Sequence, residues 1–329
     1  MWSRSRVVAV AFGLSLIVVV GVVGIPVLYP SFVYLTTHPP RLNLRVAYYS
    51  GEGTTPACHT IIVHAVEWMG CSATPIRGWD IREGCLAEYD VVLFPGGHPP
   101  AFRDEVGPVG RILIQDFVAN GGGYFGICGC AYIACDYTII EDDPAFPIPN
   151  TRIEGENLSL DLFPGVAWGP VFEVPHETTL EGMTQIDIHH NHPITASLPD
   201  TYQIQYLGGP HFQPYIDADC TILGTFHIND APAIVACPYH AGRVFLISVH
   251  GEIEERSDRD GWELPPQYGI EPYDEDTEYP LLYEAMRWIG HLTPNPAPPT
   301  RTYTTLHNRI LTFFTKEEPK LPIVKFNKN

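Results

Sequence analysis

The stretch Gly-Gly-Gly-Tyr-Phe-Gly-Ile-Cys-Gly-Cys at residues 121–130 places a short apolar run directly before Cys128. The run Tyr124–Ile127 is typical of a buried strand, and a helix is predicted to start at Gly129. A sharp turn from strand to helix needs small neighbours and projects its central side chain from the carboxyl edge of a sheet. The stretch therefore predicts an α/β fold with Cys128 at such an edge.

Strand and helix signals alternate on the amino-terminal side of this stretch. Apolar, β-rich runs that end in glycine or proline turns predict strands, and apolar residues at helical spacing predict helices. The predicted strands are 44–49, 74–77 and 91–94, and the predicted helices are 56–69, 81–88 and 109–119. This alternation predicts a doubly wound, mostly parallel, flavodoxin-like sheet.

The carboxyl-terminal side is less regular. Residues 140–209 are rich in proline, glycine and asparagine, and we interpret them as an inserted β-rich segment of antiparallel character. A hairpin around Asn229-Asp230, a further strand and a closing helix follow. They are predicted at 220–226 with 231–236, at 244–249 and at 281–289. The α/β domain is thus expected to span residues 42–292, with a proline-rich linker and tail at 293–329.

The chain begins with a segment that predicts a membrane anchor within residues 1–35. Residues 7–29 carry no charge, and that length suffices for a helix to cross the hydrocarbon core. Arg4 and Arg6 precede the segment, which predicts a cytoplasmic amino terminus and an extracytoplasmic main domain. The alternatives are a cleaved signal peptide or a buried core helix.

Composition restricts the partners. Nineteen basic and 38 acidic residues give a formal net charge of −19, which repels nucleic acid. We expect no cofactor. The histidines at 189, 190 and 192 are assigned to a solvated loop, with a metal site as the less favoured alternative.

Eight cysteines in an exported domain would allow disulfides. Cys220 and Cys237 fall nearly opposite each other across the predicted hairpin, so they are the preferred pair. Cys58, Cys71 and Cys85 offer another pair, and the connectivity stays open.

The strand–helix turn at Cys128 provides what a nucleophilic thiolate needs. The amino-terminal end of the following helix stabilises negative charge on the sulfur. The backbone amide of Gly129 can form half of an oxyanion hole, and the loop Gly96-Gly97, at the end of a neighbouring strand, can supply the other half. The competing interpretation is that Cys128 is a buried apolar residue without chemistry.

A thiolate nucleophile also needs a base. His250 follows the predicted strand 244–249, and Glu252 lies two residues later, on the same side of an extended chain. Glu252 can therefore orient the His250 ring, as the acidic member of a triad does. The other histidines considered as bases are His98, His211 and His240.

With these residues in place, the chain resembles the biotin-protein ligase N-terminal domain family, within the class-I glutamine amidotransferase-like superfamily. The resemblance covers about residues 45–290 and is most specific at 121–132. The other matching stretches are 49–54, 89–97, 207–210 and 250–252. It implies that Cys128, His250 and Glu252 occupy the positions of a catalytic triad.

Two positions depart from that family's usual pattern: Cys130 stands where glycine is usual, and Gly251 where proline is usual. A second thiol beside the turn puts efficient catalysis in doubt more than it does the fold. No biotinyl-adenylate loop is found, and the remaining length is too short for the ligase domain, so we expect no biotin ligation.

The sequence thus predicts a cysteine hydrolase or amidase that acts on C–N bonds of a small-molecule or peptide ligand. Its pocket is expected to include His98, Gly208, Gly209 and His211. The alternative is a non-catalytic ligand-binding or sensing module. A glutaminase that feeds ammonia to a partner is less favoured, because ammonia-channelling synthases are cytoplasmic.

Overall fold

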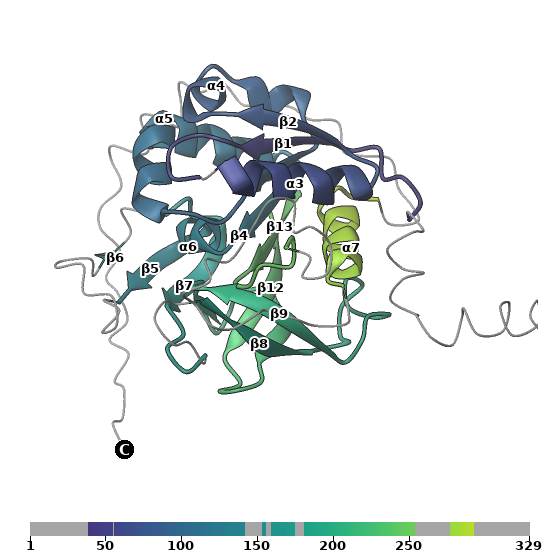
Figure 1. Cartoon of the computed structure of the whole chain (residues 1–329). Helices are drawn as coiled ribbons and strands as arrows, with labels where there is room; N and C mark the ends of the chain where they lie inside the picture. The colour runs from purple at the N-terminus through teal and green to yellow at the C-terminus, as the bar shows by residue number, and fades with distance from the viewer. Residues whose placement is uncertain are drawn as a thin grey trace, which may run out of the picture.

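The computed structural model describes residues 39–54, 56–141, 153–155, 159–174, 181–253 and 277–292. Within them the chain forms a nine-stranded sheet in the order β2-β1-β3-β4-β13-β12-β11-β8-β9 and a four-stranded sheet in the order β10-β7-β5-β6. The larger sheet runs through the whole molecule, from β2 near the top of Figure 1 to β8 and β9 near its base.

Five strands of the larger sheet are parallel, and they form the half that we call the parallel half. They are β2 (Ser72–Ile76), β1 (Arg45–Tyr49), β3 (Val91–Phe94), β4 (Gly123–Ile127) and β13 (Gly242–Ile247). Both β3 and β4 are buried along their whole length, which explains their continuous apolar sequences. These strands confirm the predicted doubly wound core.

The remaining strands of that sheet pair in antiparallel fashion, and we call them the antiparallel half. They are β12 (Pro232–Tyr239), β11 (Thr221–Phe226), β8 (Glu181–Ile188) and β9 (Thr201–Leu207). The prediction of a mostly parallel sheet is therefore wrong, because β8 and β9 extend the main sheet instead of forming a separate insertion. The hairpin of β11 and β12 is confirmed.

The smaller sheet takes β6 and β7 from the segment predicted as an insertion, 140–209, and β5 and β10 from its two flanks. Its strands are β10 (His211–Pro214), β7 (Phe163–Gly169), β5 (Cys135–Ile140) and β6 (Ile153–Gly155). The pairs β10–β7 and β5–β6 are antiparallel as expected, whereas β5 and β7 run parallel.

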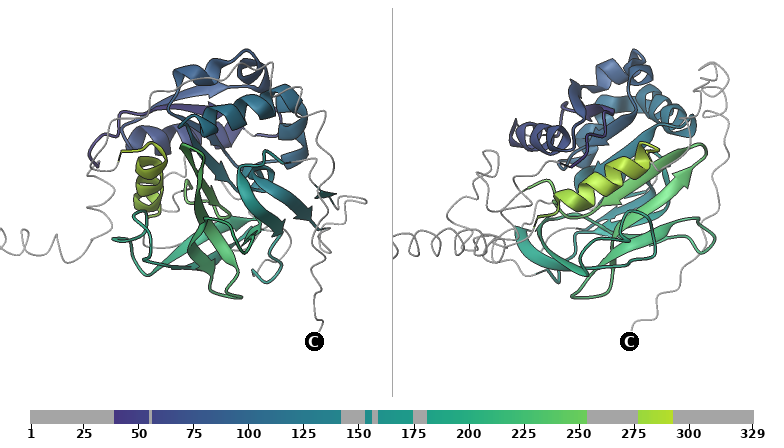
Figure 2. Two further views of the ribbon diagram at one scale, coloured as in Figure 1. Left: turned by 180° about the vertical axis from the view of Figure 1, so that it is seen from behind. Right: turned by 90° about the vertical axis from the view of Figure 1, so that its right-hand side faces the viewer.

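Helices and the smaller sheet cover the two faces of the larger sheet (Figures 1 and 2). One face packs against α3 (Pro56–Trp68) and α7 (Tyr279–Ile289), which contribute buried side chains such as Val66 and Met286. The other face packs against the smaller sheet and the remaining helices. These are α4 (Gly78–Arg82), the 3₁₀ helix η1 (Cys85–Glu88), α5 (Pro99–Ala119) and α6 (Gly129–Ala134).

Two predicted helices differ from the structure. The predicted helix 81–88 is divided into α4 and η1 by Gly84, whose φ of 88° no regular helix accepts. The predicted helix 109–119 begins ten residues earlier, at Pro99, and is kinked at Gly107-Pro108. The sequence at this kink resembles a helix boundary because proline removes a backbone donor there.

The predicted anchor at 7–29, the linker and the tail lie outside the described residues. In the part of the chain that the structure does describe, no helix combines the length and apolar composition that crossing a bilayer would require.

All eight cysteines are described, and each is a free thiol. The hairpin register pairs Thr221 with Ala236 and so places Cys220 opposite Cys237, as predicted. The two thiols hydrogen-bond to each other without a covalent bridge, so the expected disulfide is absent from this structure.

Candidate active site

Cys128 lies at the turn between β4 and α6 and has φ 48° and ψ −112°. Non-glycine residues rarely adopt this conformation, and such strain is concentrated at functional sites. The surrounding sheet holds the turn in place, because the Cys128 amide donates to the carbonyl of Ile247 at 2.9 Å. The carboxyl ends of β4 and β13 thus fix the backbone of the predicted nucleophile.

Two glycines allow the strand ends to meet around Cys128. A Cβ atom at Gly96 would lie 2.6 Å from Cε1 of His250 and 3.3 Å from Cβ of Cys128. A Cβ atom at Gly129 would lie only 2.0 Å from the Gly97 carbonyl oxygen. The structure therefore brings Gly96, Gly97 and Gly129 together beside the thiol, where the predicted oxyanion donors belong.

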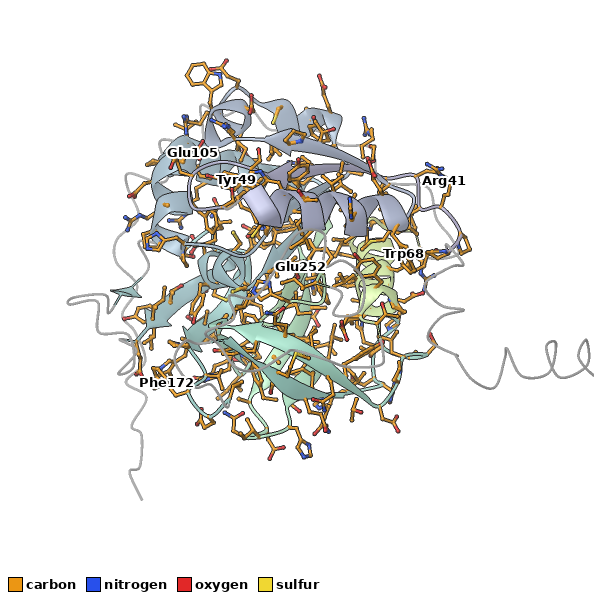
Figure 3. The ribbon with its side chains drawn as sticks, viewed as in Figure 1. Arg41, Tyr49, Trp68, Glu105, Phe172 and Glu252 are labelled. Atoms are coloured by element: carbon orange, nitrogen blue, oxygen red, sulfur yellow. The ribbon has the colours of Figure 1, made fainter. Side chains whose placement is uncertain are left out.

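The predicted base and its orienting carboxylate are adjacent and buried. His250 Nδ1 and Glu252 Oε1 are 2.7 Å apart, and both residues are 4% exposed. Figure 3 shows Glu252 near the middle of the molecule, between the two halves of the larger sheet. The His250 amide donates to the carbonyl of Gln205 at 2.8 Å, so β9 positions this loop from the antiparallel half.

Opposing effects act on the pKa of His250. Burial lowers it, whereas the negative charge of Glu252 and the neighbouring Cys128 sulfur raise it, and together they hold it well above its usual range. The imidazole is therefore favoured in its protonated form near neutral pH. A cation beside Cys128 is the condition under which a thiol ionises readily.

The Cys128 sulfur lies close enough to this ring to raise its pKa, but the well-formed hydrogen bond of the thiol goes to the main chain. Its Sγ atom donates to the carbonyl oxygen of Leu207 at 3.3 Å, and Cys128 is only 6% exposed. His250 Nε2 is buried and meets no hydrogen-bond partner among the described residues. The three triad positions are thus assembled, with the sulfur directed to a main-chain acceptor.

The loop after β9 also reaches the site, as predicted for Gly208 and Gly209. Gly209 packs on Ser248, two residues before His250, because a Cβ atom there would lie 2.0 Å from the Ser248 carbonyl oxygen. The carbonyl of Gly208 accepts a hydrogen bond from Tyr132 at 3.1 Å. The carbonyl of Gly209 accepts one from Tyr206 at 2.8 Å.

The other histidines have different surroundings. His98 is exposed at the start of α5, with its amide bonded to the carbonyl of Gly53. His211 stacks on Trp168 in the smaller sheet. His240 lies in the exposed turn between β12 and β13, at the opposite end of β13 from His250. The structure thus brings His250, of the four candidates, against Gly96 and Cys128.

The two departures from the family pattern have separate surroundings. Cys130 is fully buried, and burial together with the nearby Cys128 raises its pKa well above the usual range. Its thiol therefore stays protonated and does not compete as a nucleophile. Gly251 packs on α7, where a Cβ atom would lie 3.0 Å from Cβ of Glu278.

The sequence analysis missed the role of Glu105 in α5. Its carboxylate accepts hydrogen bonds from Tyr49 and from the amides of Glu52 and Gly78 (Figure 3). Tyr49 ends β1, Glu52 lies in the loop after it, and Gly78 begins α4 after β2, so Glu105 fixes the edge of the sheet on which the Gly96-Gly97 loop packs. An acidic residue within an amphipathic helix was the only signal. No sequence signal could indicate that Leu207 accepts a hydrogen bond from Cys128, because the acceptor is its main-chain carbonyl.

The histidine-rich loop has a different partner for each ring. His189 contacts the Thr225 hydroxyl, His190 lies between the Thr195 carbonyl and Asp200, and His192 packs on Trp288. Among the described residues, no group of three or more metal-ligating side chains is placed to hold an ion.

Comparison with known families agrees with this geometry. Residues 44–263 match the family described as biotin-protein ligase, N terminal. The chain belongs to this family. The match contains Cys128, His250 and Glu252, so the candidate site lies inside the family domain.

Two curated relatives share limited parts of their length with the chain. An uncharacterised protein of Chlamydia muridarum is 28% identical over 138 residues, which cover 39% of this chain and 50% of that protein. The biotin–protein ligase of Schizosaccharomyces pombe is 21% identical over 265 residues, covering 76% of this chain and 38% of the ligase. The chain thus spans half or less of each.

The solved structures that are similar to this chain include a glutamine amidotransferase and a ThuA-like protein. A glutamine amidotransferase of Thermotoga maritima has 14% identity and a TM-score of 0.47, with 75% of this chain and 98% of that chain covered. A ThuA-like protein of Bacteroides uniformis has 16% identity and a TM-score of 0.44, with 79% and 95% covered.

Proposed function

We propose that this protein is a membrane-anchored cysteine hydrolase or amidase that acts on C–N bonds, with Cys128 as nucleophile. The observation that carries the proposal is the buried His250–Glu252 pair, which packs with Cys128 against Gly96 at the carboxyl edge of the sheet. Nucleophile, base and orienting carboxylate are together, as acyl transfer through a cysteine requires.

The reaction would begin from a Cys128 thiolate beside protonated His250, with the former thiol proton on Nε2, the ring atom without a well-formed hydrogen bond in the structure. The sulfur then attacks the amide carbon, and the carbonyl electron pair moves onto oxygen. Backbone amides at Gly97 and Gly129 are the proposed donors to that oxyanion.

The tetrahedral intermediate would collapse when the protonated His250 gives its proton to the leaving nitrogen. The C–N bond breaks, an amine or ammonia leaves, and a thioester remains on Cys128. A water molecule that loses its proton to His250 then hydrolyses the thioester to a carboxylic acid. Glu252 holds the ring with Nδ1 directed away from the sulfur throughout.

The proposal includes the anchor at residues 7–29, with the main domain outside the cytoplasm. The proposed ligand is a small molecule or peptide, and the net charge of −19 disfavours nucleic acid. Treatment of intact cells with a membrane-impermeant maleimide tests the topology. Labelling of the full-length protein only after lysis would contradict it.

The chemistry is tested by alkylating Cys128 with iodoacetamide in the full-length protein in detergent. The thiolate sulfur displaces iodide, and mass spectrometry reports the rate at each cysteine. We expect His250→Gln to slow labelling of Cys128 at pH 6.5 by about tenfold or more, since one unit of thiol pKa changes the thiolate fraction about tenfold. The matched control is His240→Gln, at an exposed histidine.

A non-catalytic binding module is the second candidate. The hydrogen bond from Cys128 Sγ to Leu207 favours it, because the thiol there donates to a main-chain carbonyl that takes no part in catalysis. Equal labelling rates for the wild type, His250→Gln and His240→Gln would support this module and contradict the hydrolase.

A further inference from the structure

The main-chain carbonyls of three consecutive residues, 207–209, each accept a hydrogen bond in the loop that reaches the candidate nucleophile. Leu207 accepts from Cys128 Sγ at 3.3 Å, Gly208 from the Tyr132 hydroxyl at 3.1 Å, and Gly209 from the Tyr206 hydroxyl at 2.8 Å. We call residues 207–209 the clasp. Each carbonyl of the clasp is thus held by a separate buried side chain.

The two tyrosines hold the clasp from different elements. Tyr132 lies on α6, the helix that starts beside Cys128, and Tyr206 lies on β9. The Tyr206 hydroxyl also accepts a hydrogen bond from the Val171 amide at 2.6 Å, so it is fixed on both sides. Burial raises the pKa of both hydroxyls well above their usual range, which keeps them protonated donors.

The backbone conformation of the clasp is tightly restricted. Gly208 has φ 73°, in the left-handed region that favours glycine, and Gly209 has no space for a side chain against Ser248. The position of the Leu207 carbonyl therefore depends on where the two tyrosines hold the next two carbonyls.

We propose that Tyr132 and Tyr206 are positioning residues that hold the clasp against Cys128, so that the Leu207 carbonyl competes with His250 for the thiol until the clasp moves. The observation behind it is that the Cys128 sulfur lies beside the His250 ring but donates to Leu207, while His250 Nε2 has no well-formed hydrogen bond; a shift of the clasp would remove the competing acceptor. The inference rests on the proposed function only in taking His250 as the group that activates the released thiol.

Removal of one hydroxyl should loosen the clasp and release the thiol. Tyr206→Phe removes a donor to Gly209 and the acceptor for Val171, whereas Tyr132→Phe removes only the donor to Gly208. The effect should therefore be larger for Tyr206→Phe. If that variant does not fold, Tyr132→Phe gives the same direction with a smaller amplitude.

The experiment is iodoacetamide labelling of Cys128 in full-length protein from pH 5.5 to 9. The variants are Tyr206→Phe, Tyr132→Phe, His250→Gln and the double variant Tyr206→Phe/His250→Gln. The matched control is Tyr124→Phe, which loses a buried tyrosine hydrogen bond to the Cys130 carbonyl at 3.0 Å, outside the clasp.

We expect Tyr206→Phe to label about three- to tenfold faster than the wild type below pH 7, with the midpoint of its pH profile shifted downward, because the released thiol pairs with His250. Tyr124→Phe should keep the wild-type profile even if its stability falls. An unchanged or slower profile for both clasp variants would overturn the inference and mean that the tyrosines serve stability alone.

The double variant separates this inference from the proposed function. If Tyr206→Phe accelerates labelling and the double variant loses that gain, the clasp inference and the proposed triad are both supported. If the gain persists without His250, the clasp controls only access, and both the His250-dependent release and the triad are contradicted. If His250→Gln slows the wild type and Tyr206→Phe changes nothing, the triad stands and the clasp fails.

Discussion

The two halves of the larger sheet contribute to the site in different ways. The parallel half supplies side chains and amides at strand ends, namely Cys128, Gly96, Gly97 and Gly129. The antiparallel half supplies main-chain carbonyls, from Gln205 to the His250 amide and from Leu207 to the thiol. The parallel half thus contributes groups that depend on which residue is present, whereas the antiparallel half contributes carbonyls that depend only on where the backbone lies.

This difference predicts which substitutions alter the reacting groups and which alter only their support. A change at a strand end of the parallel half alters the reacting groups themselves. A change in the antiparallel half alters how the reacting groups are held. The predictions below test that division, beginning with whether the halves unfold together.

The largest effect is expected from truncating a buried aromatic side chain in either half. Phe94 stacks on Tyr49 at 4.9 Å in the parallel half, and Phe226 meets Tyr206 at 5.8 Å in the antiparallel half; both are 0% exposed. Phe94→Ala and Phe226→Ala should each cost about 3–5 kcal/mol in free energy of unfolding, measured by urea titration.

A single unfolding transition should be seen for each of these variants, because one continuous sheet joins the halves. Ile216→Ala is the control, since Ile216 is fully exposed and its loss should leave the urea midpoint unchanged. Two separate transitions in either alanine variant would show that the halves are independent units.

Matched glycine substitutions compare the halves directly. Gly129→Ala sets a Cβ atom 2.0 Å from a backbone oxygen, whereas Gly224→Ala in β11 meets a side-chain methyl group of Ile186 at 2.9 Å. We expect Gly129→Ala to cost about 1–3 kcal/mol and to slow Cys128 labelling strongly. Gly224→Ala should cost less, because a side chain can move more readily than a strand-end backbone.

The same labelling and urea measurements check both variants. If Gly224→Ala slowed Cys128 labelling as much as Gly129→Ala, the distinction between reacting groups and their support would be lost.

The sequence predicted the parallel half well because its signals are local. Apolar runs such as 91–94 end in glycine or proline, and each buried strand is visible in its own letters. The conjunction of Cys128 with His250 and Glu252 also followed, because strand ends of parallel strands meet at one edge. Cys128 and His250 both pack on Gly96, and Glu252 bonds to His250, in agreement with that prediction.

The antiparallel half was harder to predict because burial and residue type do not coincide there. In β8 the buried positions include Thr184, whereas Met183 is only half-buried, so the period-two pattern of hydrophobicity is lost. The clasp was invisible for a different reason: its function lies in carbonyl groups that every residue possesses. No property of the Leu207 side chain signals it.

A further prediction concerns pH. The folded protein holds the pKa of His250 above its unfolded value of about 6.5. The associated stability is therefore fully present below about pH 6.5 and is lost as pH rises through the folded pKa. Each unit of elevation corresponds to about 1.4 kcal/mol.

Urea titrations of wild type and His250→Gln at pH 6, 7.5 and 9 measure this effect. The stability advantage of the wild type should decrease as the pH rises. A difference that stays constant across the range would mean that His250 has an ordinary pKa and that its electrostatic coupling to Glu252 and Cys128 is absent.

The smallest effect is expected at the surface of the antiparallel half. His227 Nδ1 lies 2.8 Å from Asp187 Oδ2, but the His227 side chain is 62% exposed. His227→Gln should change the free energy of unfolding by less than about 1 kcal/mol at pH 6, because solvent and salt screen such pairs. A larger loss that survives high salt would show an unrecognised structural role.

Strand β13 has one parallel neighbour, β4, and one antiparallel neighbour, β12. The β4 side provides Cys128, and the strands beyond β12 provide the carbonyls of Gln205 and Leu207 that hold the His250 amide and the thiol. Because β8, β9, β11 and β12 all fall between Glu181 and Tyr239, a homologous antiparallel half could be exchanged as one continuous insert that ends just before β13, which would change ligand recognition while the Cys128 turn and the His250 loop are inherited intact.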